Sequence, residues 1–332
     1  MSDNKGILVL GEIANGDMSA TTTEILGCAR RLADELKESV TCVLISDQMG
    51  DAPQKAIKFG ADKIITVTDA SFKDYQNDTF AMALEKIIKD NSPKLVLMAQ
   101  SSIGRDLAPT VAFRNGVGLA MDCLDIKIDD AGKYFELTRS VYGGNAQATF
   151  MSEDMPQIAT IRQKAMSPIV PDDARKGEIV PVQTAIDTSK IKIRVIETVK
   201  EEVAGIKLED APVIVTGGRG IGGNEGFKQL EELARTLKGA VGATRPPCDN
   251  GWSPETSQVG LTGKIVSPDL YIAVAVSGAS QHMAGCSGAK NIIAINKDAE
   301  SNIFKFSRFG IVGDWKQVLP ALTEKVKKLV SS

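Results

Sequence analysis

Short apolar runs alternate with longer amphipathic segments along most of this chain, and that alternation limits the folds open to it. Segments from Thr21 to Leu36 and from Phe80 to Ile88 place apolar residues at helical spacing. Strands that are apolar throughout and separated by helices are typical of a parallel sheet covered on both faces. The sequence therefore predicts an α/β fold, whose first four strands are expected at 6–11, 41–46, 63–67 and 94–98.

The pattern changes after about residue 118. Three segments rich in β-forming residues follow, two of them separated by Gly143-Gly144, and they predict a hairpin or meander added to the first sheet at 122–128, 134–142 and 146–151. Residues 166–191 contain three prolines and predict an extended connection. A further strand is expected at 192–198.

The alternation begins again in the last third of the chain. A helical segment runs from Phe227 to Leu237, a closing helix is expected from Trp315 to Val330, and strands are expected at 212–216, 270–277, 291–295 and 310–313. A charged stretch at 199–210 precedes this part, and 332 residues are enough for two domains. We expect an N-terminal domain over 1–200 and a second domain over 201–332.

Composition excludes several classes of protein. A net charge of −3 does not favour binding to nucleic acid or to an anionic membrane, and no segment approaches the ~20 apolar residues of a membrane span. Five cysteines, an odd number without a CxxC pair, argue against a disulfide framework. The N-terminus has no signal-peptide pattern. A cytoplasmic protein is expected.

Residues 218–223 satisfy the pattern GxGxxG directly after a predicted strand and before a predicted helix. Glycines allow a phosphate to approach the backbone, and free N–H groups at a helix start attract anions. A tight turn that needs glycine is the alternative interpretation. An NAD(H) site would place an acidic residue after the second strand, where this chain has Arg245. NADP or a different ligand geometry remains open.

Four sequence blocks follow the glycine turn in a fixed order and are more specific than the turn alone. Together with GGRG (217–220), these blocks form one pattern. They resemble the alpha subunits of electron transfer flavoproteins, a resemblance that extends more weakly into SSIGRDLAP (101–109). The blocks are VGATRPPCDNGW (241–252), QVGLTGK (258–264), SGASQHMAG (277–285) and INKD (295–298).

The resemblance implies an FAD site. It implies that Arg245 and Thr262 lie near the isoalloxazine ring, that His282 approaches its pyrimidine edge, and that Asn296 and Asp314 hold the adenosine end. Leu261 departs from the glutamine that many relatives carry there, which leaves redox tuning open. The full implied set is Arg219, Thr244, Arg245, Gln258, Val259, Gly260, Leu261, Thr262, Ser277, Gly278, Ala279, Ser280, Gln281, His282, Asn296 and Asp314.

These residue types suit a flavin on chemical grounds. A guanidinium and an imidazole donor would stabilise the negative charge of the reduced ring, and a threonine hydroxyl suits N5. Each has a structural alternative. His282 could be a hydrogen-bonded core histidine, Arg245 a surface cation beside two prolines, and Asp314 the cap of the last helix.

The expectation is a two-domain α/β protein, with an N-terminal parallel-sheet, nucleotide-hydrolase-like domain and a C-terminal doubly wound FAD-binding domain. The resemblance implies a beta-subunit partner, and a dehydrogenase or another flavoprotein as electron donor or acceptor. Two rivals remain at this stage. One is an NAD(P)-dependent oxidoreductase that uses the turn at 218–223, and the other is a nucleotide sensor without redox function.

Overall fold

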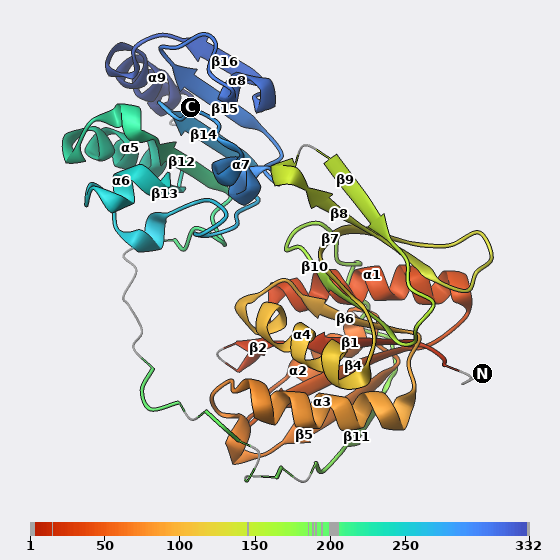
Figure 1. Ribbon diagram of the computed structural model, residues 1–332. Coiled ribbons are helices and arrows are strands. Elements are labelled where there is room, and N and C mark those ends of the chain that lie inside the picture. The colour runs from red at the N-terminus through yellow and green to blue at the C-terminus, as the bar shows by residue number, and fades with distance from the viewer. Residues whose placement is uncertain are drawn as a thin grey trace. The chain divides into compact units, whose positions relative to one another are not determined.

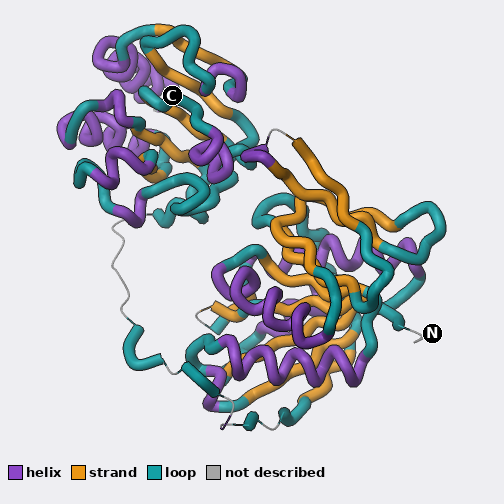
Figure 2. The backbone as a smooth tube through the Cα atoms, viewed as in Figure 1, coloured by secondary structure: helices purple, strands orange, loops and turns teal. Residues whose placement is uncertain are grey.

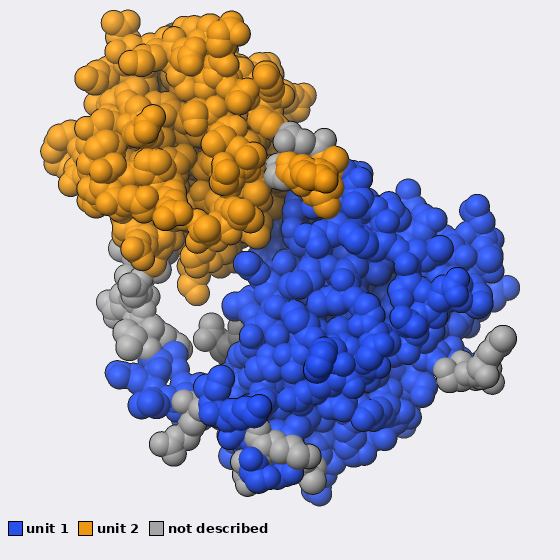
Figure 3. Space-filling model, in the orientation of Figure 1, with its two compact units in different colours: residues 1–140, 147–199 blue, residues 141–146, 200–332 orange. Residues whose placement is uncertain are grey.

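The chain forms two compact units, which Figure 3 shows in different colours. One unit comprises residues 1–140 with 147–199, and the other comprises 141–146 with 200–332. The computed structural model describes residues 4–14, 16–144, 146–184, 186–187, 189, 191–193, 195–198 and 206–330.

The first unit is built on a nine-stranded sheet (Figure 1). Its strands are ordered β11-β5-β4-β1-β6-β10-β7-β8-β9, and the pairs from β11 to β7 are parallel. The strand β8 pairs antiparallel with β7. The bounds are β1 (Ile7–Gly11), β4 (Val40–Ser46), β5 (Lys63–Thr68), β6 (Leu95–Ala99), β7 (Leu119–Ile128), β8 (Phe135–Val141), β9 (Ala146–Phe150), β10 (Gln157–Ile161) and β11 (Glu178–Pro181).

Helices cover both faces of this sheet, as the tube in Figure 2 makes visible. Alternate residues of β1 enter different cores: Ile7 packs with α1 and α2, whereas Leu8 packs with α3 and α4. Side chains of Ser19 and Ser101 cap α1 and α4. The elements are α1 (Ala20–Leu36), α2 (Ala52–Lys58), α3 (Asn77–Asn91), α4 (Ser102–Asn115), β2 (Ile13–Ala14), β3 (Asp17–Met18) and the 3-10 turn η1 (Ala70–Phe72). A second 3-10 turn, η2 (Tyr142–Gly144), lies in the segment 141–146 that is counted with the other unit.

The predicted strands of this region form with small changes of boundary, but two expectations fail. The proline-containing connection at 166–191 includes β11, which pairs with β5 at the edge of the sheet. The strand expected at 192–198 does not form among its described residues, 192–193 and 195–198. Ile196 there is 93% exposed. β-forming residues do not make a strand without a sheet edge to pair with.

The second unit has a five-stranded, fully parallel sheet in the order β13-β12-β14-β15-β16. Its core residues separate α5, α6 and α9 on one face from α7 and α8 on the other. The bounds are β12 (Val213–Gly217), β13 (Ala240–Ala243), β14 (Leu270–Val274), β15 (Ile292–Asn296), β16 (Phe309–Val312), α5 (Asn224–Thr236), α6 (Arg245–Asp249), α7 (Ser280–Cys286), α8 (Ile303–Phe306), α9 (Trp315–Val330), η4 (Arg219–Ile221) and η5 (Glu255–Ser257).

Both units therefore confirm the α/β fold that the alternation predicts. Among the residues that the structure describes, no helix is long and apolar enough to cross a membrane.

Glu12, directly after β1, gives the first unit a testable pH dependence. Burial raises the pKa of its carboxyl above 4.5, and the hydrogen bond from Ser101 Oγ opposes this effect. The unfolded chain therefore ionises first, so stability falls as pH rises from about 4.5 through the folded pKa. We expect Glu12→Gln to raise the free energy of unfolding at pH 7, and we expect the gain to disappear towards pH 4.

Urea denaturation followed by circular dichroism at both pH values measures this effect. Glu35→Gln, at an exposed position of α1, is the matched control and should change little. Both tryptophans of the chain, Trp252 and Trp315, lie in the second unit, so their fluorescence should not respond to either change. A gain that is equal at both pH values would contradict the role assigned to the Glu12 charge.

Candidate functional site

The strand order of the second unit has a switch point between β12 and β14, where a binding crevice is expected. The chain passes from β12 outward to β13 and then crosses back to β14, on the opposite side of β12. Connections that diverge from neighbouring carboxyl ends in this way open a binding crevice between them. In this sheet the crevice is expected between the loops after Gly217 and Val274.

All sixteen residues that the resemblance implies lie at this carboxyl edge. The segment from Gln258 to Thr262 reaches it by a parallel bridge between Ala243 and Gln258. The others follow the strand ends: Arg219 after β12, Thr244 and Arg245 after β13, 277–282 after β14, Asn296 at the end of β15 and Asp314 after β16. Segments far apart in the sequence are thus brought to one edge, as Figure 1 shows.

Two glycines let the loops at this edge pass close to one another. A Cβ at Gly218 would lie 2.1 Å from the carbonyl oxygen of Ala275, and a Cβ at Gly278 would lie 2.3 Å from the backbone nitrogen of Ile303. Gly278 also has φ +76°, which an L side chain rarely adopts. Both contacts are with backbone atoms that cannot swing away. Only glycine allows these loops to close over the edge.

Apart from the Asp314 carboxylate, the exposed polar side chains that the sixteen residues bring to this edge are cations, hydroxyls and amides. Arg219 and Arg245 are exposed cations. Exposed neutral hydroxyl or amide groups come from Thr262, Ser277, Ser280 and Gln281. Helix α5 starts after Gly223, which has no side chain to cap the first-turn N–H groups. Cations, hydroxyls and free amides suit a ligand with a pyrophosphate and a polyhydroxyl chain, so this set is compatible with FAD.

Arg245 is the first residue of α6. Its Nε lies 3.3 Å from Asp249 Oδ2, and the two side chains are 66% and 60% exposed. An exposed pair of this kind contributes little free energy, so the guanidinium can leave Asp249 for an anionic partner at low cost. Contact between Arg245 and a flavin ring stays a prediction.

The segment from Gln258 to Thr262 is fastened on both sides. The Val259 N–H donates to the Ala243 carbonyl at 2.9 Å, and the Leu261 N–H donates to the Gln281 carbonyl at 2.8 Å. Gln258 Nε2 donates to Thr262 Oγ1 at 2.9 Å. Between these anchors the Leu261 side chain is 59% exposed, an apolar group presented at a polar edge.

His282, the chain's single histidine, lies beneath this segment and is buried. Its Nδ1 is 2.9 Å from the Val259 carbonyl oxygen, and its Nε2 is 3.0 Å from the Tyr271 hydroxyl. Burial lowers the pKa of the imidazole to about 4, while the hydrogen bond to Val259 opposes the shift. Both ring nitrogens are therefore engaged within the protein. A direct contact with a pyrimidine edge stays a prediction.

Asn296 and Asp314 also make bonds inside the unit. Asn296 Nδ2 donates to the Val276 carbonyl at 2.8 Å and to Ser301 Oγ at 3.1 Å, and its Oδ1 accepts from the Asp298 N–H. Asp314 Oδ1 accepts from the Lys316 N–H at 3.0 Å and so caps α9. The capping alternative for Asp314 is thus realised, whereas contacts with an adenosine stay predictions.

Three residues that support this edge were not predicted. Tyr271 is fully buried beside His282, and Ser301 Oγ donates to the Ser277 carbonyl at 3.2 Å. Trp315 Nε1 donates to the Gly220 carbonyl at 3.0 Å and fixes the glycine turn to α9. In the sequence, Trp315 is recognised only as the start of a predicted helix, and Tyr271 only as one residue of a predicted strand. A polar tip within an apolar element was the available signal, because buried Tyr and Trp find a partner.

Thiol and metal chemistry have no support at this site. All five cysteines are free and buried, and burial raises the pKa of Cys286 to about 12. A thiol that is protonated at neutral pH is a poor nucleophile and a poor ligand. Within the described parts of the chain, no cluster of His, Cys, Asp and Glu could hold a metal ion.

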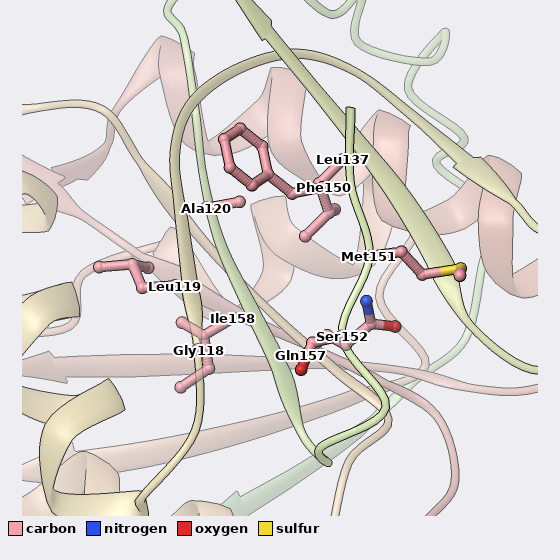
Figure 4. Close-up of a pocket in the computed structure, with 9 residues that line it drawn as sticks. All are labelled: Gly118, Leu119, Ala120, Leu137, Phe150, Met151, Ser152, Gln157 and Ile158. Atoms are coloured by element: carbon pink, nitrogen blue, oxygen red, sulfur yellow. The ribbon is translucent and has the colours of Figure 1, made fainter. Parts of the chain in front are cut away.

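The first unit contains a separate hollow of about 200 Å³, drawn in Figure 4. Its lining has no cation, carboxylate, imidazole or thiol, and the Gln157 amide is already bonded to both backbone groups of Phe135. It offers apolar surface and no redox chemistry. The lining residues are Gly118, Leu119, Ala120, Leu137, Phe150, Met151, Ser152, Gln157 and Ile158.

Comparison with known proteins agrees with this geometry. The electron transfer flavoprotein domain matches residues 7–187, and the electron transfer flavoprotein FAD-binding domain matches residues 207–287. The chain is 42% identical to an electron transfer flavoprotein subunit alpha from Thermoanaerobacterium thermosaccharolyticum, over 99% of this chain and 100% of that relative. It is 39% identical to the subunit alpha from Bacillus subtilis, over 98% of each chain. It is 34% identical to the protein FixB from Clostridium saccharobutylicum, over 100% of this chain and 99% of that relative.

The glycine turn, the cations after β12 and β13 and the hydroxyl-bearing loop after β14 all lie in or beside the matched FAD-binding region. The chain therefore belongs to the electron transfer flavoprotein alpha-subunit family, with its FAD-binding domain in the second unit.

Proposed function

We propose that this chain is the FAD-holding subunit of a heterodimeric electron carrier. One observation carries the proposal. Four separate segments of the second unit bring cations, hydroxyls and free amides to the carboxyl edge of a doubly wound sheet. An enzyme that transfers protons would need an acid or base with a suitable pKa at the same edge. The one histidine of this chain, His282, is instead buried and bonded within the protein. The arrangement suits binding and electrostatic tuning of a redox cofactor.

FAD, when bound, accepts and releases electrons one or two at a time. The residues of this chain orient it and set its potential. We assign Arg245 to stabilising the negative charge of reduction, since a guanidinium keeps its charge and stacks on a planar ring. Arg219 and the loop from Ser277 to Gln281 are assigned to the phosphates and the polyhydroxyl chain. Asn296 and Asp314 are assigned to the adenosine end.

The domain arrangement is part of the proposal. Residues 1–200 would pack against a beta subunit, and 201–332 would hold FAD. Exposed apolar side chains in the first unit support a partner there: Phe113 is 86% exposed, Met151 57% and Phe150 45%. Phe150 and Met151 are adjacent in the chain, and contiguous exposed apolar surface is typical of a contact surface. The relatives that are named as alpha subunits support the same assembly.

Electrons would come from an acyl-CoA dehydrogenase-type flavoenzyme or from NADH, and would leave for another flavoprotein or an iron–sulfur acceptor. Bifurcation would require a second flavin, held mainly by the partner.

The test is an absorption spectrum and flavin count of the complex, purified after co-expression with a beta subunit of the same protein family. We expect FAD in the complex, and poor FAD retention by the chain expressed alone. One flavin per heterodimer supports simple transfer, and two support bifurcation. A complex without flavin that binds NAD(P) would overturn the proposal in favour of a dehydrogenase using 218–223, and a complex without either would favour a nucleotide sensor.

A further inference from the structure

A buried hydrogen-bonded bridge connects three elements beneath the proposed site. Tyr271 lies on β14, His282 on α7 and Val259 in the loop that follows η5. The Tyr271 side chain has no exposed surface, and His282 is 6% exposed. The imidazole joins the other two through its two nitrogens. None of the sixteen expected cofactor residues is Tyr271, so its hydroxyl is without an assigned role.

The partners determine where the imidazole proton lies. The Val259 carbonyl oxygen can only accept, so Nδ1 must carry the hydrogen and donate at 2.9 Å. In the neutral ring Nε2 is then bare and accepts from the Tyr271 hydroxyl at 3.0 Å. The titratable group that is bonded to the ring is Tyr271 on β14, and the loop contributes the Val259 carbonyl, whereas Cys286 on the same helix bonds to the backbone carbonyl of His282. Among the residues that the structure describes, no cation or carboxylate is bonded to the ring.

We propose that Tyr271 and His282 are positioning residues: the neutral imidazole, fixed by the Tyr271 hydroxyl, holds the Val259 carbonyl and so sets the position of the loop from Gly260 to Thr262 at the FAD site. This inference rests on the proposed function. The loop's own geometry supports it, because Gly260 has φ +149° and packs its backbone against Gly285 of α7, where a Cβ would lie 2.4 Å from the Gly260 nitrogen. The loop is thus set on α7 at two adjacent points.

The bridge has a consequence for charge. Burial lowers the pKa of His282 to about 4, so the ring is uncharged at neutral pH. The guanidinium of Arg245, rather than the imidazole, then supplies the positive charge that favours reduction. This differs from the role that the resemblance implies for His282, in which the ring faces the flavin as a donor.

Nitrogen NMR on the complex distinguishes the two roles, because the chain has one histidine. The chain is labelled with ¹⁵N-histidine and assembled with an unlabelled partner. We expect one neutral imidazole with the proton on Nδ1, unchanged between pH 6 and pH 8 and unchanged when FAD is removed. A proton on Nε2, or a large ring shift on FAD binding, would overturn the positioning role.

Variants add a second readout. In Tyr271→Phe we expect the His282 pKa to rise, because the neutral ring loses its donor, and the Kd for FAD to rise about tenfold as the loop loosens. His282→Asn keeps a donor for the Val259 carbonyl, so its affinity for FAD should resemble that of Tyr271→Phe. His282→Ala should bind FAD more weakly than either of these variants. Tyr134→Phe, in the first unit, is the matched control. Wild-type FAD affinity in Tyr271→Phe would overturn the inference.

Failure of the proposed function would look different. A wild-type complex without flavin would refute FAD binding, while the tautomer measured without flavin would still test the bridge.

Discussion

Gly218→Ala is expected to remove FAD from the complex while leaving the first unit folded. The new methyl group would lie 2.1 Å from the Ala275 carbonyl oxygen and 2.8 Å from the Val276 Cα. Both are backbone atoms of the loop after β14, so the loops that define the crevice must separate. Overpacking costs about 1–3 kcal/mol or more, and here it acts directly on the binding loops. We expect the FAD Kd to rise about a hundredfold, which flavin content after dialysis and a fluorescence titration would measure.

Two glycine variants control for this effect. Gly118→Ala, in the first unit, meets nothing closer than Ser152 Oγ at 3.9 Å and should retain FAD. Gly222→Ala has open space around it but φ +83°, so it tests backbone strain of about 1–2 kcal/mol without a clash. Gly218 itself has φ −93°, which alanine tolerates. If Gly218→Ala retained as much flavin as Gly118→Ala, the crevice would lie elsewhere.

Arg245→Ala is expected to lower the reduction potential of the bound flavin. The guanidinium is 66% exposed and pairs only weakly with Asp249, so it can stabilise the negative charge that reduction adds. Loss of one nearby cation corresponds to about a tenfold change in the one-electron equilibrium, or ~60 mV. A redox titration of the complex at fixed ionic strength measures the shift.

Asp249→Asn should move the potential in the opposite direction, because it removes the competing carboxylate from Arg245. Arg235→Ala, in the last turn of α5, removes an exposed cation of the same type and serves as the control. Equal shifts for Arg235→Ala and Arg245→Ala would show that the net charge of the domain, rather than the position of Arg245, sets the potential.

Much of the fold follows from short-range pattern. The closing helix has the predicted bounds, Trp315–Val330, and the strands of the second unit differ from expectation by one to three residues. Fully buried parallel strands are continuous apolar runs, which makes them visible in a sequence. Neither β10 nor β11 was assigned as a strand from the sequence, and of these the central strand β10 is fully buried. The strand expected at 192–198 failed and the edge strand β11 was missed for a related reason. Both depend on whether a sheet edge is available, and local composition does not report that.

The candidate site shows the same division. Glycines, cations and hydroxyls could be selected from the sequence, because they follow predicted strands and recur in family-like blocks. The hydrogen bonds that these residues make within the protein could not be predicted from the sequence. Asn296 ties Val276 to Ser301, Asp314 caps α9, and His282 is enclosed between two partners. Each of these contacts joins positions that are unrelated in spacing.

The order of residues along this chain determined its α/β class and the second series of alternating strands and helices after the charged stretch. It also determined which polar side chains follow the strands at the carboxyl edge. These properties depend on neighbours within a few positions. Tertiary structure alone decided that β14 lies beside β12, so that Ala275 meets Gly218, and that Tyr271 lies within reach of His282. Such contacts are set by how strands and helices pack in three dimensions, and packing is a property of the whole unit rather than of any segment.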